Sequence, residues 1–211
     1  MAKLIIRVPA TSANLGSGID SVGLALQLYY TVIVEEKTDE WKVNHALGND
    51  IPTDENNLIV QAILKVNAEI HPHQLTVISD VPIAHGLGSS TTAVVAGIKI
   101  ANKLGDLGFS IEDQINLGAK FEGHPENVAA ALLGSLVVSS YDGDQTIATS
   151  ISIPDISALM YIRPDGVSEE KSRKKLPKQL DYDQAVQQSS RENVFIALAA
   201  QGKWDQAVSL I

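Results

Sequence analysis

Hydrophobic and polar positions in the first part of the chain mostly alternate with the two-residue period of β-strands. Residues 3–8 predict a first strand, and residues 41–45 predict a short one. The longest predicted strand covers residues 24–36 and places six apolar side chains on one face: Leu24, Leu26, Leu28, Tyr30, Val32 and Val34. Residues 57–70 carry apolar side chains at helical spacing, and residues 75–79 return to a strand pattern. We therefore expect an opening that is mostly β, with one helix.

Helical patterns then dominate the middle of the chain. A run of small and β-branched residues directly after residues 82–90 predicts a buried helix. A second helix begins at Ser110, where Asp113 occupies the capping-box position, and a third covers residues 127–133. The rest of the pattern predicts strands at residues 136–140, 146–153 and 158–163, and helices at residues 169–175, 182–201 and from residue 203 onward.

Composition narrows the classes of function. The 211 residues carry a net charge of -9, which argues against nucleic acid as a partner. The apolar stretch in the first ten residues is too short for a signal peptide, and the longest apolar region, residues 128–138, is too short to span a bilayer. The absence of cysteine excludes disulfides and thiol catalysis. We expect a cytoplasmic protein with no membrane partner.

Residues 82–90 have the composition of a phosphate-binding loop. Gly86 and Gly88 allow sharp turns and close approach of a ligand, and the amides of residues 88–90 would lie at a helix N-terminus, where the dipole favours an anion. The loop lacks the lysine of a Walker A motif, and Thr91 stands where a dinucleotide fingerprint needs glycine. A second interpretation stays open at this point, namely a glycine turn and a serine N-cap on an ordinary core helix.

Three polar segments accompany this loop: residues 14–20, residues 122–127, and Arg173 in a later basic run. Taken singly, these segments fit a turn, a helix end and a solvated surface. The loop and the first two of these segments lie in three motifs that resemble the homoserine kinases of the GHMP small-molecule kinase superfamily, and the resemblance extends to residues 168–177, which contain Arg173. The motifs are PATSANLGSGID at residues 9–20, PIAHGLGSSTTAVVAG at residues 82–97 and EGHPENVAAALLGSLV at residues 122–137.

The resemblance implies an α+β GHMP kinase fold and an ATP-dependent enzyme that phosphorylates the side-chain hydroxyl of L-homoserine. It implies an N-terminal domain over residues 1–153, similar to ribosomal protein S5 domain 2, and part of a ferredoxin-like domain over residues 154–211. Asn57 is expected near the adenine. The triphosphate is expected on a loop of eleven residues: Pro82, Ile83, Ala84, His85, Gly86, Leu87, Gly88, Ser89, Ser90, Thr91 and Thr92.

The same resemblance implies a metal site and an acceptor site. Ser90 and Glu122 would bind Mg²⁺, which takes hard oxygen ligands. The acceptor would contact five side chains: Asn14, Asp20, His124, Asn127 and Arg173. Asp20 suits the ammonium group of homoserine and Arg173 its carboxylate, while Asn14 would orient the hydroxyl. No residue is singled out as an essential base, and Asp20 is the rival candidate for that role.

Departures from the family pattern leave alternatives open. Ser17 and Ile19 stand where proline and phenylalanine are usual, and Glu169 stands where a hydroxyl residue is frequent. The superfamily has another motif, a glycine-rich loop near the C-terminus that is known as its third motif and differs from the three quoted above. This loop is absent from the 211 residues, so we expect an incomplete copy of the kinase. The alternatives are a GHMP kinase for another small alcohol, and a non-catalytic metabolite-binding relative. A homodimer is compatible with each of these.

Overall fold

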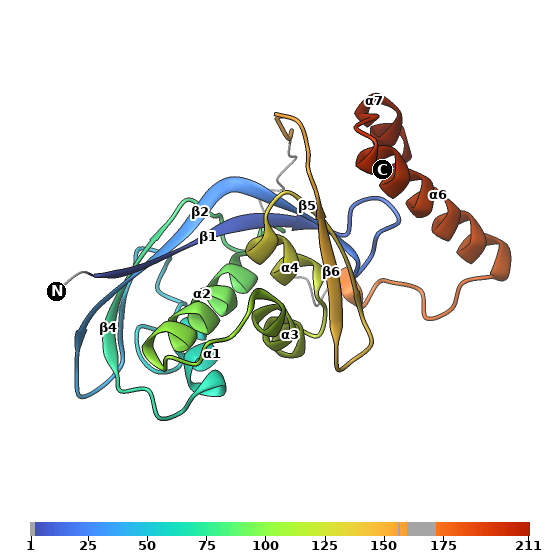
Figure 1. Cartoon of the computed structure of the whole chain (residues 1–211). Helices are drawn as coiled ribbons and strands as arrows, with labels where there is room; N and C mark the ends of the chain where they lie inside the picture. Colours follow the sequence, from blue (N-terminus) through green and yellow to red (C-terminus); the bar gives the residue numbers. More distant parts are fainter. Residues whose placement is uncertain (1–2, 156, 160–171) are drawn as a thin grey trace.

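The structure, a computed structural model, describes residues 3–155, 157–159 and 172–211. Six strands form one sheet in the order β3-β4-β2-β5-β6, with β1 paired to β2 (Figure 1). Their bounds are Leu4–Ala13 (β1), Val22–Lys37 (β2), Lys42–Asn44 (β3), His73–Ser79 (β4), Leu136–Tyr141 (β5) and Thr146–Ile151 (β6). The pairs are antiparallel except for β3 with β4.

Strand β2 joins the two ends of the sheet. One edge of β2 pairs with β1 from Leu4↔Val34 to Ala13↔Gly23. The other edge pairs first with β5, from Val22↔Val138, and then with β4, up to Lys37↔His73. The alternation predicted for this strand is confirmed in its second half, where Tyr30, Val32 and Val34 are buried in the main core. In its first half the leucines of the same face are only partly buried. Strand β2 therefore connects the β4 end of the sheet with its β5 end.

Strand β1 is longer than the sequence predicts. It continues from Val8 through Pro9 to Ala13, although the sequence predicts a loop over residues 9–20 from its many Ser, Asn and Gly residues. The register shifts between Pro9 and Thr11. Proline donates no hydrogen bond and is tolerated at such an irregularity. Beyond the shift, the amide of Thr11 donates to the Leu87 carbonyl at 3.1 Å, so this part of β1 contacts the predicted phosphate loop.

Four helices cover one side of the sheet (Figure 1). They are α1 (Leu58–Val66), α2 (Ser89–Leu104), α3 (Ile111–Glu122) and α4 (Glu126–Leu133). The capping box of Ser110 and Asp113 is confirmed at the start of α3, and Gly134 ends α4 at φ 74. Helix α1 stops at Val66, four residues before the predicted end, although Ile70 is buried as its apolar pattern required.

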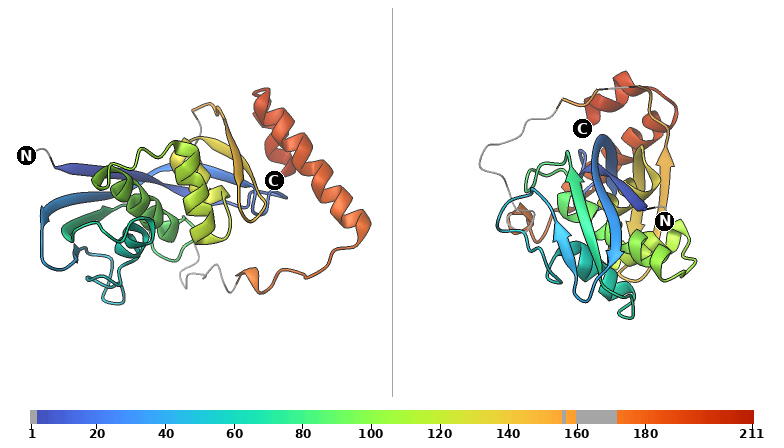
Figure 2. Two further views of the ribbon diagram at one scale, coloured as in Figure 1. Left: turned by 60° about the horizontal axis from the view of Figure 1, so that its bottom comes forward. Right: turned by 90° about the vertical axis from the view of Figure 1, so that its left-hand side faces the viewer.

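Two C-terminal helices lie at the end of the sheet where β1 turns into β2, away from α1 (Figures 1 and 2). They are α6 (Tyr182–Ala200) and α7 (Trp204–Ala207), followed by a 3-10 turn at Val208–Leu210. Phe195 and Ala199 of α6 pack with Val22 of β2 and Leu136 of β5 in a second core cluster. Most of the strand predicted at residues 158–163 lies outside the described residues. Of the helix predicted at residues 169–175, residues 172–175 are described, and they form a short helical turn at residues 172–173. In the described part of the chain, no helix combines the length and apolarity needed to cross a bilayer.

Candidate active site

The loop before α2 has the backbone of an anion-binding site. Ala84, Gly86 and Gly88 adopt positive φ angles of 60, 73 and 65 degrees at alternate positions. Alternation of this kind turns successive N–H groups toward one side, which forms a concavity for anions. Positive φ angles are common for glycine but rare for alanine, so the angle of Ala84 is the unusual one of the three.

The N-terminus of α2 leaves its first amides for a ligand. Its N-cap is Gly88, and no side chain of the described residues caps the helix. The first turn contains no acidic residue, and the earliest intrahelical bond is donated by Thr92 to the Gly88 carbonyl. The preceding N–H groups of a helix have no intrahelical acceptor. The serine-cap interpretation is therefore wrong, and the geometry instead suits an anion such as phosphate.

The surroundings of the two loop glycines, Gly86 and Gly88, differ. A Cβ on Gly88 would collide with Thr11 Oγ1 and would lie 3.4 Å from Asn127 Oδ1. At Gly86 no described atom lies within 4 Å of such a Cβ. Gly88 thus allows the loop to pack against β1 and α4, whereas Gly86 faces open space.

A chain of buried polar side chains lies beneath the loop. Thr11 Oγ1 donates to Asn127 Oδ1 at 2.7 Å, and Asn127 Nδ2 donates to Glu126 Oε1 at 3.2 Å. His124 Nδ1 lies 3.1 Å from the same Glu126 oxygen. All four residues are buried, and Glu126 is 0% exposed. The sequence motifs predict His124 and Asn127 as site residues but not Thr11 and Glu126, although both of these also lie inside the quoted motifs.

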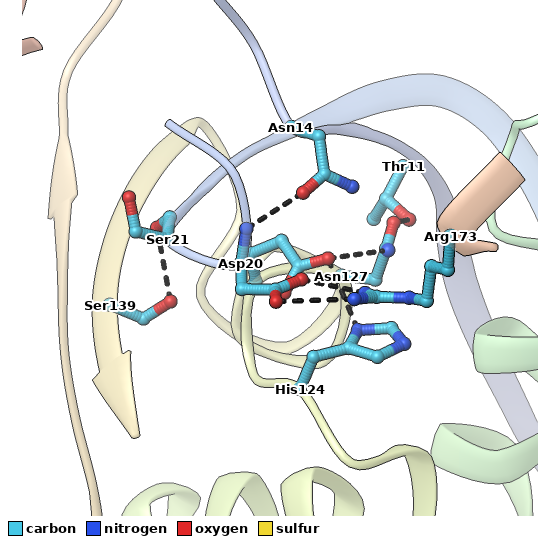
Figure 3. Close-up of polar contacts among 9 residues, drawn as sticks. Thr11, Asn14, Asp20, Ser21, His124, Asn127, Ser139 and Arg173 are labelled. Carbon is cyan, nitrogen blue, oxygen red and sulfur yellow. Dashed lines mark hydrogen bonds and ion pairs between the residues drawn. The ribbon is translucent and has the colours of Figure 1, made fainter. Parts of the chain in front are cut away.

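The loop between β1 and β2 carries two of the predicted acceptor residues in a strained backbone. Asn14 and Asp20 have φ angles of 59 and 57 degrees, and Asn14 Oδ1 accepts from the Asp20 amide at 2.7 Å. The carboxylate of Asp20 accepts two hydrogen bonds from Arg173, at 2.6 and 3.1 Å. Figure 3 shows these side chains next to His124 and Asn127. The structure therefore brings all five predicted acceptor residues into one region.

The C-terminal helix α6 supports this loop. Ser17 Oγ donates to Gln188 Oε1 at 2.8 Å, and a Cβ on Gly18 would lie 2.9 Å from Glu192 Oε1. Burial raises the pKa of the Glu192 carboxyl above its ordinary value, while the backbone N–H of Ser17 opposes the shift. Residues far apart in the sequence thus fix the shape of the acceptor loop.

The predicted metal ligands lie on adjoining helices. Ser90 is exposed in the first turn of α2, and Glu122 is the last residue of α3. Phe121 packs in a cluster with Val94, which places the end of α3 against α2. Among the residues described, no group of three or more His, Asp or Glu side chains could hold a metal ion. A hydroxyl and one carboxylate fit Mg²⁺ when phosphate oxygens complete its coordination.

Asn57 has a structural role in addition to the one predicted for it. It is buried and caps α1, because its side chain accepts from the Ile59 amide at 3.0 Å and donates to the Pro52 carbonyl at 2.6 Å. Both ends of the side-chain amide are therefore engaged within the protein. Its placement near an adenine stays a prediction.

Comparison with known proteins agrees with this geometry. Residues 57–135 match the GHMP kinases N terminal domain. Homoserine kinases of Bacillus cereus (strain G9842) and Bacillus anthracis are 42% and 43% identical to the chain, over 97% of its length and 69% of theirs. A solved structure from Listeria monocytogenes, assigned as a homoserine kinase, superposes with a TM-score of 0.85 at 39% identity, covering 98% of this chain and 71% of that one. A Streptococcus pneumoniae phosphomevalonate kinase shares the fold, with a TM-score of 0.71 at 13% identity over 100% of this chain and 77% of that one.

Proposed function

The chain belongs to the homoserine kinase family of the GHMP kinases, and we propose that it transfers the γ-phosphoryl group of ATP to the side-chain hydroxyl of L-homoserine. The observation that carries this proposal is the uncapped N-terminus of α2, preceded by three alternate residues at positive φ. Its free amides suit the triphosphate of a nucleotide, since backbone N–H groups and the helix dipole both favour negative charge. The products are O-phospho-L-homoserine and ADP.

The acceptor end of the site supports an amino-acid substrate. Asp20 and Arg173 present one negative and one positive group in the same region as Asn14. An amino acid offers the complementary ammonium and carboxylate, whereas mevalonate and sugars lack the ammonium. Asn14 Oδ1 is already bonded to the Asp20 amide, which leaves its Nδ2 group to orient the substrate hydroxyl.

Phosphoryl transfer needs positioning and charge neutralisation more than covalent chemistry. In the proposed reaction the hydroxyl oxygen forms a bond to the γ-phosphorus, the bond to the ADP oxygen breaks, and the hydroxyl proton is released. Mg²⁺, when bound, neutralises charge on the phosphate oxygens. Ser90 and Glu122 would hold it, while the amides at residues 88–90 bind the phosphates.

The remaining expectations belong to the same proposal. They are a domain boundary between residues 153 and 154, action in the cytoplasm, assembly as a homodimer, and the absence of nucleic-acid and membrane partners. The low identity to phosphomevalonate kinase limits that comparison to the fold, so it does not favour another small alcohol as substrate.

The test is ATP consumption by the purified protein with L-homoserine, mevalonate or galactose as acceptor. We expect turnover with homoserine alone, with O-phosphohomoserine identified by mass spectrometry. Turnover with mevalonate or galactose in place of homoserine would transfer the proposal to a different small-alcohol kinase. ATP binding without turnover on any acceptor would favour a non-catalytic relative.

A further inference from the structure

We infer that Glu126 and Thr11 are positioning residues that fix the orientation of the Asn127 amide and the His124 ring in the acceptor site. The inference rests on the proposed function for its kinetic consequence but on the contacts of the free protein for its geometry. Neither residue is among those that the family resemblance assigned to ATP, Mg²⁺ or homoserine. Their contacts form one continuous chain from β1 to the start of α4.

The carboxylate sets the direction of every hydrogen bond in this chain. Glu126 Oε1 accepts from Asn127 Nδ2 at 3.2 Å, so the side of Asn127 that faces Glu126 is its NH₂ group. The carbonyl side of Asn127 then faces Thr11, whose hydroxyl must donate. One proton on Asn127 Nδ2 remains without an acceptor in the described part of the chain, and a substrate oxygen can use it. The carboxylate thus selects one of the two amide orientations of Asn127.

The same oxygen of Glu126 also faces the imidazole. His124 Nδ1 lies 3.1 Å from Glu126 Oε1, an ion-pair contact rather than a hydrogen bond, so the carboxyl group attracts this side of the ring. A histidine held through one ring nitrogen presents the other in a fixed direction. One carboxylate oxygen therefore orients two side chains that belong to the proposed acceptor site.

Because Glu126 is completely buried, its carboxyl group is not explained by fold stability alone. Its side chain is 0% exposed, and no donor among the described residues reaches Oε2. A buried carboxylate oxygen without a partner is costly, and an apolar side chain of similar volume would avoid that cost. The carboxyl group is therefore better explained by its contacts with Asn127 and His124 than by its contribution to folding.

Thr11 connects this chain of contacts to the phosphate loop. Its amide donates to the Leu87 carbonyl at 3.1 Å, and its hydroxyl occupies the space that a Cβ on Gly88 would need. The residue thus contacts the loop and Asn127 at once. Because in-line attack depends on the distance between acceptor and phosphate, Thr11 is placed to set the spacing between the two parts of the site.

The experiment compares Glu126→Gln, Glu126→Asp and Thr11→Val with the wild-type protein. We expect Glu126→Gln to lower kcat/KM for homoserine on the order of 10- to 100-fold, with the KM for ATP unchanged within about twofold and an unchanged or higher Tm. Glu126→Asp should retain more activity than Glu126→Gln. The double variant with Thr11→Val should lose less than the product of the two single losses, because both act through Asn127.

Matched controls separate positioning from general damage. Thr146→Val removes another buried strand hydroxyl, and Glu35→Gln neutralises a carboxylate bonded to Gln74 at the other end of β2. Both controls should keep wild-type kinetics. Wild-type kcat/KM in Glu126→Gln would overturn the inference, and so would a lowered Tm with equal losses toward ATP and homoserine.

A second readout does not depend on turnover. The side-chain NH₂ resonances of Asn127, identified by their absence from Asn127→Asp, should shift in Glu126→Gln and stay unchanged in Thr146→Val. Unchanged resonances in Glu126→Gln would overturn the positioning role. If the wild-type protein does not phosphorylate homoserine, the proposed function fails, and these resonances still decide whether Glu126 orients Asn127.

Discussion

Arg173 and Asp20 bind each other through two parallel hydrogen bonds, Nη2 to Oδ1 at 2.6 Å and Nη1 to Oδ2 at 3.1 Å, with 34% and 44% of their side chains exposed. Both residues are expected to bind opposite charges of one substrate. An amino acid would therefore exchange this ion pair for two new ones, its ammonium with Asp20 and its carboxylate with Arg173. A ligand with only one of these charges would leave one protein charge without a partner.

The first prediction follows from this exchange. Asp20→Asn and Arg173→Gln should each lower kcat/KM for homoserine on the order of 10- to 100-fold, because each removes one charged hydrogen-bond partner of the substrate. Steady-state kinetics with saturating ATP measures the effect. The Tm should change little, since partly exposed ion pairs contribute at most about 1 kcal/mol. If Asp20→Asn abolished turnover while homoserine affinity stayed at the wild-type level, Asp20 would have to be the base instead.

The second prediction concerns the two requirements on Gly88. Gly88→Ala should abolish ATP binding and destabilise the fold by about 1 to 3 kcal/mol, because the methyl group meets Thr11 and the backbone is at φ 65. Nucleotide titration by calorimetry and urea unfolding measure the two effects. Gly108→Ala is the matched control, with φ +68 and no described atom within 4 Å of its Cβ, in the loop between α2 and α3. Equal ATP affinity in the two variants would remove Gly88 from the nucleotide site.

The third prediction tests the metal ligands. Ser90→Ala and Glu122→Gln should raise the Mg²⁺ concentration for half-maximal turnover by about tenfold or more, because each variant removes one hard oxygen donor. The measurement is initial rate against free Mg²⁺ at constant ATP. Glu112→Gln, an exposed carboxylate in the first turn of the same α3 helix, serves as the control. A parallel shift in the control would mean that net charge, rather than coordination, sets the Mg²⁺ requirement.

The fourth prediction uses the raised pKa of Glu192. Since burial favours its protonated form in the folded state, its contribution to stability is fully present below the ordinary value of 4.5 and is lost as pH rises through the higher folded pKa. Glu192→Gln cannot ionise, so it should match the wild-type free energy of unfolding in acid and exceed it at neutral pH. Urea unfolding at both pH values measures this. The exposed Glu69→Gln should show no such difference, and a wild-type profile in Glu192→Gln would refute the burial argument.

The elements of regular period were predictable from the sequence. The alternation in β2, the capping box at Ser110 and the helix Tyr182–Ala200 depend on local pattern, and the structure confirms all three. The continuation of β1 past Pro9 was not predictable, because its polar residues read locally as a loop. They are held as a strand by β2 and by the contact of Thr11 with Leu87.

Most residues of the candidate site were predictable from the sequence, but the contacts between them were not. The motifs select Asp20, His124 and Asn127, and the family resemblance adds Arg173, but the direct pairing of Asp20 with Arg173 joins residues 153 positions apart. The orienting role of Glu126 depends on complete burial, which a lone glutamate in a first helical turn does not reveal. Acidic residues are common there because the helix dipole favours them, so local pattern gives Glu126 an ordinary explanation.

The hydrogen bond between Thr11 and Asn127 spans 116 residues, and the bond between Ser17 and Gln188 spans 171. During synthesis on the ribosome, β1 emerges first but cannot acquire these partners until most of the chain has followed. Chains fold slowly when such distant contacts must close, and the waiting segments are exposed to aggregation. The nascent protein therefore completes its acceptor loop only when α6 docks, so slow translation after α4 would lengthen the period in which β1 and its loop lack these contacts.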